Sequence, residues 1–319
     1  NYRKIMKFLS NNSIWIIVFI IFILMFFASE NFFTLNNQLN VLRQVSILGI
    51  ICIGIAIVLI GGNFDLSIGA IITACAVTSL AMQPSSPGLT LLSIIIPITV
   101  GLLCGLINGI LVGYLNLNSI VATIGTQFTF TGFLLYSVSG QHVYAFDTHA
   151  IYFFISNGRL FGIPFPVYLL FSFYILAFII LKFSLFGRYL EAVGGNIKSA
   201  YLSGINTKKI IVYSYLISGL MSSLGGILIA SRVRNMDPTA GIGYEFLALT
   251  AVILGGTKLT GGYGRIFNVF AGVLIIGLIS NSITLLNLSY YAKLLIQGFI
   301  FLLVVGYDSY LNNFSKANV

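Results

Sequence analysis

Asp65 is the most unusual ionisable residue of this sequence, because it stands in a short break between two long apolar runs. The break, residues 61–69, has the sequence Gly-Gly-Asn-Phe-Asp-Leu-Ser-Ile-Gly. A carboxylate near the bilayer hydrocarbon costs at least ~3 kcal/mol unless it faces protein, water or a polar partner. Non-helical backbone at that depth is tolerated only around a cavity or inside protein. Asp65, together with Asn63 and Phe64, therefore either lines a pathway for a solute or caps the next helix by accepting its N–H groups.

A second glycine-rich break, residues 254–265, has the sequence Leu-Gly-Gly-Thr-Lys-Leu-Thr-Gly-Gly-Tyr-Gly-Arg. A Walker loop needs Gly-x4-Gly-Lys-Ser/Thr, whereas Lys258 follows Thr257. The pattern favours a tight turn between two apolar runs. No Walker sequence occurs elsewhere in the chain. If ATP drives a process here, its hydrolysis belongs to another subunit.

The sequence offers no catalytic or metal-binding constellation. His142 and His149 are seven residues apart and lack the HExxH spacing, and no GxSxG elbow is present. Cys52, Cys75 and Cys104 lie within apolar runs without CxxC spacing, which indicates small core residues. We therefore expect no catalytic residue, no metal site and no cofactor on this chain.

The elements that must position these residues are membrane-spanning helices. Of the 319 residues, 58% are hydrophobic and only 7% are charged, whereas soluble domains carry about 25% charged residues. An apolar run of about twenty residues can cross a bilayer core of about 30 Å. The sequence predicts an all-α fold, a polytopic integral membrane helical bundle forming one domain over residues 1–319. The expected spans, about ten, are 14–29, 45–61, 66–82, 90–113, 119–138, 166–183, 208–230, 244–257, 266–286 and 292–307.

Uncharged polar side chains recur within or near the expected spans. They are Asn108, Thr123, Thr126, Gln127, Asn268, Asn281, Ser282 and Gln297. Each is more often an interhelical hydrogen bond than a ligand contact. Together they indicate a weakly polar path suited to an uncharged, hydroxylated solute. Thr123, Thr126 and Asn281 join the 61–69 break as candidates for that path.

The distribution of basic residues predicts the orientation. With the N-terminus inside and ten spans, eleven of the sixteen basic residues fall on the cytoplasmic side. The five that fall outside are Arg43, Arg159, Arg232, Arg234 and Lys293. This bias fits the positive-inside rule and predicts cytoplasmic N- and C-termini. The net charge of +9 is such a topology signal and does not imply binding of nucleic acid.

Residues 187–209 form the longest polar, charge-bearing segment between two apolar runs. Its apolar spacing could support one or two short helical turns. Connections between helices are usually shorter than twenty-odd residues. We interpret the segment as a docking element for a soluble partner, and an ordinary cytoplasmic loop is the alternative.

Several long motifs, in order, resemble the permease subunits of ABC importers for ribose and related sugars. They are Asn-Phe-Phe-Thr at 31–34, the break at 61–69, Ile-Val-Ala-Thr-Ile-Gly-Thr at 120–126, Gly187-Arg188, Gly-Gly-Asn at 194–196, Ser-Gly-Ile-Asn at 203–206, the 238–245 stretch, Leu-Gly-Gly-Thr at 254–257 and Gly-Tyr-Asp at 306–308. The likeness covers nearly the whole chain. It implies the type II-like architecture of ABC importer permeases.

This resemblance also implies the partners. Two permease subunits, identical or paralogous, would pair in the bacterial cytoplasmic membrane, and two ATP-binding cassette subunits would dock on their cytoplasmic face and bind ATP and Mg²⁺. An extracytoplasmic sugar-binding protein would deliver the cargo. The coupling segment toward the ATPase would lie at about 187–207. Its expected coupling residues are Arg188, Glu191, Gly194, Gly195, Asn196, Ala200, Ser203 and Gly204.

The chain departs from the family pattern at two places. Lys198 and Ser199 stand where small residues are common, which would retune the fit to the ATPase. Asn63 and Phe64 replace the usual Gly-Ile, which bears on the identity of the cargo. Ribose, xylose, galactose, furanose-type solutes and a sugar-like signal molecule are all open. The rival hypothesis is an ion-coupled secondary transporter that acts without an ATPase, with Asp65 as its relay carboxylate.

Overall fold

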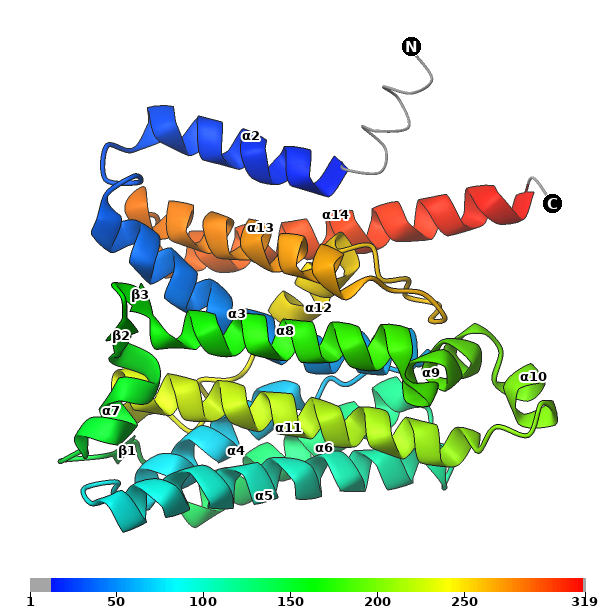
Figure 1. Ribbon diagram of the computed structural model, residues 1–319, viewed down its shortest axis with the longest axis horizontal. Helices are drawn as coiled ribbons and strands as arrows, with labels where there is room; N and C mark the ends of the chain where they lie inside the picture. The colour runs from blue at the N-terminus through cyan, green and yellow to red at the C-terminus, as the bar shows by residue number, and fades with distance from the viewer. Residues whose placement is uncertain (1–12, 318–319) are drawn as a thin grey trace.

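A computed structural model describes residues 13–317, and all elements in this range are helices apart from four strands of two residues each (Figure 1). Six helices are long and apolar enough to cross a membrane. They are α3 (Leu35–Ile60), α5 (Pro87–Gly113), α6 (Ser119–Ser137), α8 (Phe165–Phe183), α11 (Thr207–Val233) and α13 (Ile266–Leu285). The protein is thus an all-α, multi-pass membrane bundle, as the sequence predicts.

Four further apolar helices complete the predicted set. They are α2 (Ser13–Ala28), α4 (Ile68–Ala81), α12 (Tyr244–Leu254) and α14 (Tyr290–Ala317), the last apolar over Tyr291–Gly306. Arg3, Lys4 and Lys7, which entered the orientation argument, lie outside the described residues. At one end of the bundle lie α9 (Leu185–Gly195) and α10 (Ile197–Leu202), and this end is called the α10 end below. The other end, called the α7 end, carries α7 (Ala150–Asn157).

The sequence-based prediction places the start of the second span too late in the chain. Helix α3 starts at Leu35 and not near residue 45, so Arg43 lies inside a helix and not in a connector. Its first turns are polar, and they are helical because Thr34 caps them by accepting the N–H of Asn37. An apolar run therefore marks the buried part of this helix and not its beginning.

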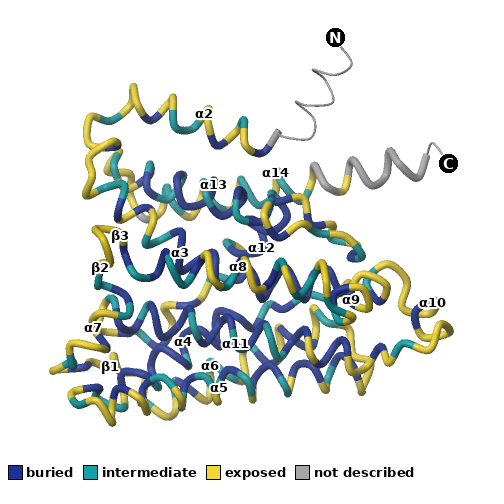
Figure 2. The backbone as a smooth tube through the Cα atoms, viewed as in Figure 1, coloured by how far each residue is buried: buried dark blue, intermediate teal, exposed yellow. Residues whose placement is uncertain are grey.

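Helices α3, α4 and α11 form the buried centre, while α2, α6 and α14 expose much of their surface (Figure 2). Glycines let α5 and α11 approach closely along their length. A Cβ at Gly101 would lie 2.5 Å from the carbonyl oxygen of Gly219, and a Cβ at Gly109 would lie 2.9 Å from the Cα of Val212. The four-residue glycine spacing of α5 is therefore a helix-packing face.

Two apolar helices are too short for a full membrane crossing of about 20 residues, and their N-terminal turns meet inside the bundle. These are α4, with 14 residues, and α12, with 11 residues. A Cβ at Gly69, near the start of α4, would overlap the Oε2 atom of Glu245, near the start of α12. The N–H of Gly241 donates to the hydroxyl of Thr73 at 2.9 Å. Interrupted helices of this kind form substrate and ion sites in many transporters.

The long connector between α6 and α8 folds over the α7 end. Strand β1 (Val143–Tyr144) pairs antiparallel with β4 (Asn235–Met236), in the register Val143 to Met236. Strands β2 (Arg159–Leu160) and β3 (Ile163–Pro164) form a small hairpin. The connector carries both histidines, which lie apart: His149 caps α7, and His142 pairs with Asp237.

Candidate functional site

Residues 61–67, between α3 and α4, are not helical and are called the irregular segment below. The buried side chain of Asp65 stabilises this segment. Asp65 is 4% exposed. Its Oδ1 atom accepts the N–H of Ser67 at 3.1 Å and the hydroxyl of Ser67 at 2.7 Å. Its Oδ2 atom accepts the hydroxyl of Ser218 on α11 at 2.7 Å. Both carboxylate oxygens are therefore used by the protein, which favours the structural interpretation of Asp65 over direct contact with a solute.

A chain of side-chain hydrogen bonds extends from this carboxylate to α5 and α6. The side-chain amide of Asn108 donates to the hydroxyl of Ser67 at 2.7 Å, and the hydroxyl of Thr126 donates to the Oδ1 atom of Asn108, also at 2.7 Å. All three side chains are buried. Because buried polar groups are costly when unpaired, this chain fixes α4, α5 and α6 in one arrangement.

The backbone of the irregular segment is held by hydroxyl groups of two helices. Ser119 and Thr123 of α6 accept the N–H groups of Phe64 (3.2 Å) and Leu66 (3.1 Å). The hydroxyl of Tyr215 on α11 donates to the carbonyl of Phe64 at 2.7 Å. Side chains thus replace the hydrogen bonds that a helix would supply, as backbone at membrane depth requires.

The structure brings together five of the six residues predicted for the solute path. Asp65, Thr123 and Thr126 are buried in the network, while Asn63 and Phe64 are partly exposed beside it. Asn281 lies elsewhere, on α13. It exchanges two hydrogen bonds with the amide of Asn37 on α3, at 2.8 and 3.1 Å. Asn281 therefore joins two helices at a separate point.

Glu245 is the second buried carboxylate, and it was not among the predicted site residues. It is 2% exposed, and both its oxygens accept the N–H of Gly243 at 3.1 Å. Gln127 of α6 donates to Oε1 at 3.2 Å. Glu245 thus links the start of α12 to α6, as the Asp65 network links the start of α4 to α6. Its place in the first turn of an apolar helix was the sequence signal for this role.

The predicted coupling segment forms two short helices that project from the α10 end (Figure 1). Asn196 separates them, and its side chain accepts the N–H of Ser199 at 2.9 Å, which starts α10. Gly204 ends it with a φ of +82°, a value that favours glycine. Ala200 is buried, whereas Arg188, Glu191, Gly195 and Ser203 are exposed. Most of the segment's polar groups therefore face outward.

Glycines join this segment to the irregular segment and to the second glycine-rich break. The N–H of Gly262 donates to the carbonyl of Ile60, the last residue of α3, at 2.8 Å. Between them lies Gly194, where a Cβ would overlap that carbonyl oxygen and lie 2.6 Å from the nitrogen of Gly262. A Cβ at Gly261 would lie 2.5 Å from the Cα of Gly62. We call residues 60–62, 194–195 and 261–262 the glycine junction.

The glycine junction is only three residues from Asp65 along the chain. A displacement of α9 would therefore press on backbone at the end of α3, which leads directly into the irregular segment. Backbone contacts without intervening side chains leave little space to absorb such a displacement. The two predicted sites are thus parts of one continuous arrangement.

Comparison with known proteins identifies the type of protein. Residues 37–305 match the family described as branched-chain amino acid transport system / permease component. The chain belongs to this permease family. One relative is the ribose import permease protein RbsC of Haemophilus influenzae, which is 33% identical over 97% of this chain and 96% of that protein. Another is the L-arabinose transport system permease protein AraH of Escherichia coli, which is 32% identical over 91% of this chain and 89% of that protein. The D-allose transport system permease protein AlsC of Escherichia coli is 34% identical over 88% and 86%. No solved structure matches the chain.

Membership confirms the resemblance that the motifs predicted. The family description names amino acids, while the three relatives are named for monosaccharides. The family therefore fixes the role of permease, and the sugars named are those of the relatives. The partners of the Asp65 network on α11, Ser218 and Tyr215, could not be found in this way, because no local pattern connects residues about 150 positions apart.

Proposed function

We propose that the chain is the membrane-spanning permease subunit of an ATP-driven importer for a monosaccharide. The observation that carries the proposal is the nearly full-length similarity to permeases named for ribose, L-arabinose and D-allose. These relatives differ in sugar and agree in the class of cargo. The polytopic bundle supplies the necessary architecture, and the uncharged polar groups beside the irregular segment suit a hydroxylated solute.

ATP and Mg²⁺ bind on a separate ATPase subunit, which docks on the α10 end. The exposed apolar groups of α10 support this docking, because Tyr201 and Leu202 are 70% and 84% exposed at the tip of the segment. Lys198 and Lys208 lie beside them and line the same shallow surface pocket. Apolar side chains with a polar rim are typical of protein interfaces. The α10 end then faces the cytoplasm, to which the N- and C-termini are also assigned, and the α7 end faces the extracytoplasmic binding protein that delivers the sugar.

Two permease subunits, identical or paralogous, assemble side by side in the bacterial cytoplasmic membrane. Transport proceeds by alternating access. Closure of the ATPase pair moves α9 and α10, and the glycine junction carries that movement to the end of α3. The irregular segment, which follows α3 directly, moves with it. Asn63 and Phe64 are the residues of that segment left available to a solute, while Asp65, Thr123 and Thr126 hold its shape.

The decisive experiment reconstitutes the chain with its ATPase and binding protein in vesicles and measures ATP-dependent uptake of radiolabelled ribose, L-arabinose and D-allose. Gly195→Trp tests the docking. No atom outside the local chain lies within 4 Å of a Cβ at this position, so the fold tolerates the new side chain while the docking surface does not. We expect loss of ATPase association and uptake with an unchanged melting temperature. Normal uptake by Gly195→Trp would contradict the docking role, and gradient-driven uptake by the chain alone would favour a secondary transporter.

A further inference from the structure

A basic pocket opens at the α7 end between α3, α11, α12, α13 and α14. Its volume is about 350 Å³, and its polar lining includes Gln44, Arg232, Tyr244, Ser280 and Lys293. Arg232 lies in the last turn of α11 and Lys293 in the first turn of α14. Both cations therefore stand close to helix ends, where the side chains of membrane proteins reach the headgroup level.

In the part of the chain that the structure describes, no carboxylate neutralises the positive charge of this pocket. Among the residues whose side chains the structure describes, no carboxylate forms an ion pair with Arg232 or Lys293. Glu245, next in sequence to a lining residue, directs its oxygens to Gly243 and Gln127. Arg43, which precedes the lining residue Gln44, is repelled by Arg232, and its buried Nε atom makes no hydrogen bond within the described part of the chain. The arrangement is suited to an anion.

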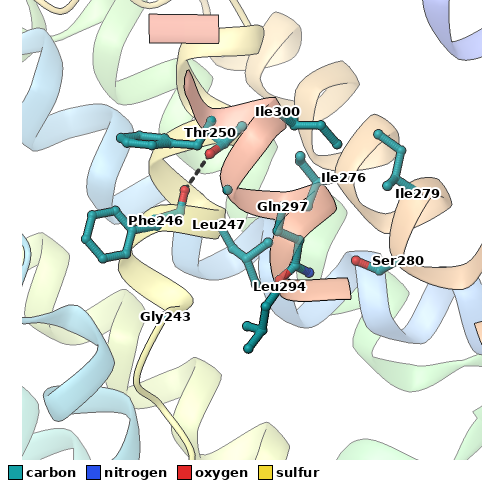
Figure 3. A pocket seen from close by; sticks show the side chains of 12 residues that line it. Gly243, Phe246, Leu247, Thr250, Ile276, Ile279, Ser280, Leu294, Gln297 and Ile300 are labelled. Carbon is teal, nitrogen blue, oxygen red and sulfur yellow. Dashed lines mark hydrogen bonds between the residues drawn. The ribbon is translucent and has the colours of Figure 1, made fainter. Parts of the chain in front are cut away.

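An apolar groove continues from the basic pocket. It has a volume of about 190 Å³ and is lined mainly by apolar side chains of α12, α13 and α14. The two cavities share Leu247, Ile276 and Ser280, so they are adjacent. Figure 3 shows the groove, with Phe246 and Leu247 on α12 and Leu294 and Ile300 on α14. Gly298 of α14 leaves it open, because a Cβ there would meet no atom within 4 Å.

We propose that the basic pocket and the apolar groove together bind one anionic phospholipid. The phosphate lies between Arg232 and Lys293, and part of one acyl chain lies in the groove between α12 and α14. A soluble anion would use the cations and leave the groove empty, whereas a zwitterionic lipid would fill the groove and gain little from the uncompensated charge. Arg and Lys side chains bind phosphate oxygens through short, charge-assisted hydrogen bonds, so a phosphate headgroup suits this pocket. This inference does not depend on which solute the permease carries.

The test compares lipid retention by the purified full-length chain in detergent. Dioleoylphosphatidylglycerol and dioleoylphosphatidylcholine are added at equal concentration, and bound lipid is measured by native mass spectrometry and by the melting temperature. We expect the wild type to retain phosphatidylglycerol in preference to phosphatidylcholine. The double variant Arg232→Gln/Lys293→Gln should lower the affinity for phosphatidylglycerol by about 30-fold, since each basic residue near a membrane surface contributes about fivefold. Arg234→Gln is the charge control, because Arg234 lies at the same end over the ring of Phe153 and does not line the pocket.

The groove is tested on its own by filling it. Gly298→Phe should reduce retention of the lipid, and Gly306→Phe, on the same helix at a position with no atom within 4 Å of a Cβ, should not. Glycerol 3-phosphate is the headgroup probe without acyl chains, and it should not displace the lipid. Equal retention of the two lipids, unchanged retention by the double variant, or displacement by glycerol 3-phosphate would each overturn the proposal. If Gly298→Phe itself melts lower without lipid, the charge variants decide.

Discussion

The Cα of Gly194, in the coupling segment, lies against the carbonyl oxygen of Ile60, the last residue of α3. A methyl group at this position would overlap the oxygen and lie 2.6 Å from the nitrogen of Gly262, which donates to that same oxygen at 2.8 Å. Three stretches of backbone that are far apart in sequence thus meet at one glycine. The contact provides a direct mechanical link between α9 and the segment that holds Asp65.

Gly194→Ala is therefore expected to separate these backbones. We predict a loss of about 1–3 kcal/mol of stability, as for overpacking elsewhere, and a large loss of ATP-driven uptake. Gly195→Ala is the matched control, because a Cβ there meets no atom within 4 Å and the stability should not change. Thermal melting in detergent and uptake in vesicles measure the two effects. A Gly194→Ala variant that melts and transports like the wild type would show that the contact is not needed.

Asp65 is expected to tolerate asparagine and not alanine. In Asp65→Asn, one oxygen still accepts from Ser67, and the new amide can donate to the hydroxyl of Ser218, which then rotates to accept. In Asp65→Ala, Ser67 and Ser218 lose their buried acceptor, at a cost of about 1–3 kcal/mol for each unpaired group. Measuring uptake and melting temperature for both variants distinguishes a structural role of Asp65 from a role as a relay. A proton or cation relay would fail in both variants, so an inactive but stable Asp65→Asn would favour the ion-coupled alternative.

The sequence predicted the apolar elements well, because the length of an apolar run directly reflects the thickness of the bilayer. It also predicted the break at 61–69 and the polar segment at 187–209, where polar residues interrupt those runs, while the coupling role of that segment stays a prediction. It missed the start of α3, since the first turns of that helix are polar and its cap is a single threonine. Hydropathy detects what is buried and not where a helix begins.

The contacts that make the site could not be predicted in the same way. Gly194 and Gly262 meet Ile60 through backbone atoms, and a glycine in a sequence does not indicate which segment it will approach. Asn281 was grouped with the solute path because of its polarity, but its partner on α3 is 244 positions away, and it pairs there with Asn37. Long-range pairing of side chains is set by helix packing, which a single sequence does not specify.

The Asn37–Asn281 pair is expected to join α3 and α13. Alanine at either position leaves the other amide without a partner in a part-buried site, so each single variant should destabilise the protein. A double-mutant cycle of Asn37→Ala and Asn281→Ala should give a coupling energy of about 0.6–2 kcal/mol, the range measured for hydrogen bonds between membrane helices. Melting in one detergent supplies the four free energies. Strictly additive effects would show that the two amides do not interact.

The β1–β4 pair should weaken in acid through Asp237. The hydroxyl and the N–H of Thr239 donate to Asp237, and together with the nearby His142, whose Nε2 lies 3.2 Å from Oδ2, they hold the pKa of this carboxyl below its ordinary value. A depressed pKa in the folded state means that the contribution to stability is present above the ordinary aspartate pKa of about 3.9 and is lost as the pH falls through the lower, folded value. Hydrogen exchange of residues 139–149 and 235–242, corrected for intrinsic rates, should show that loss between pH 4 and pH 2. Thr239→Val removes the hydroxyl donor and keeps the N–H, which brings the folded pKa of Asp237 closer to its ordinary value, so its loss of protection in acid should be smaller and should be complete at a higher pH. Identical profiles for Thr239→Val and the wild type, or protection that increases in acid, would contradict this role of Asp237.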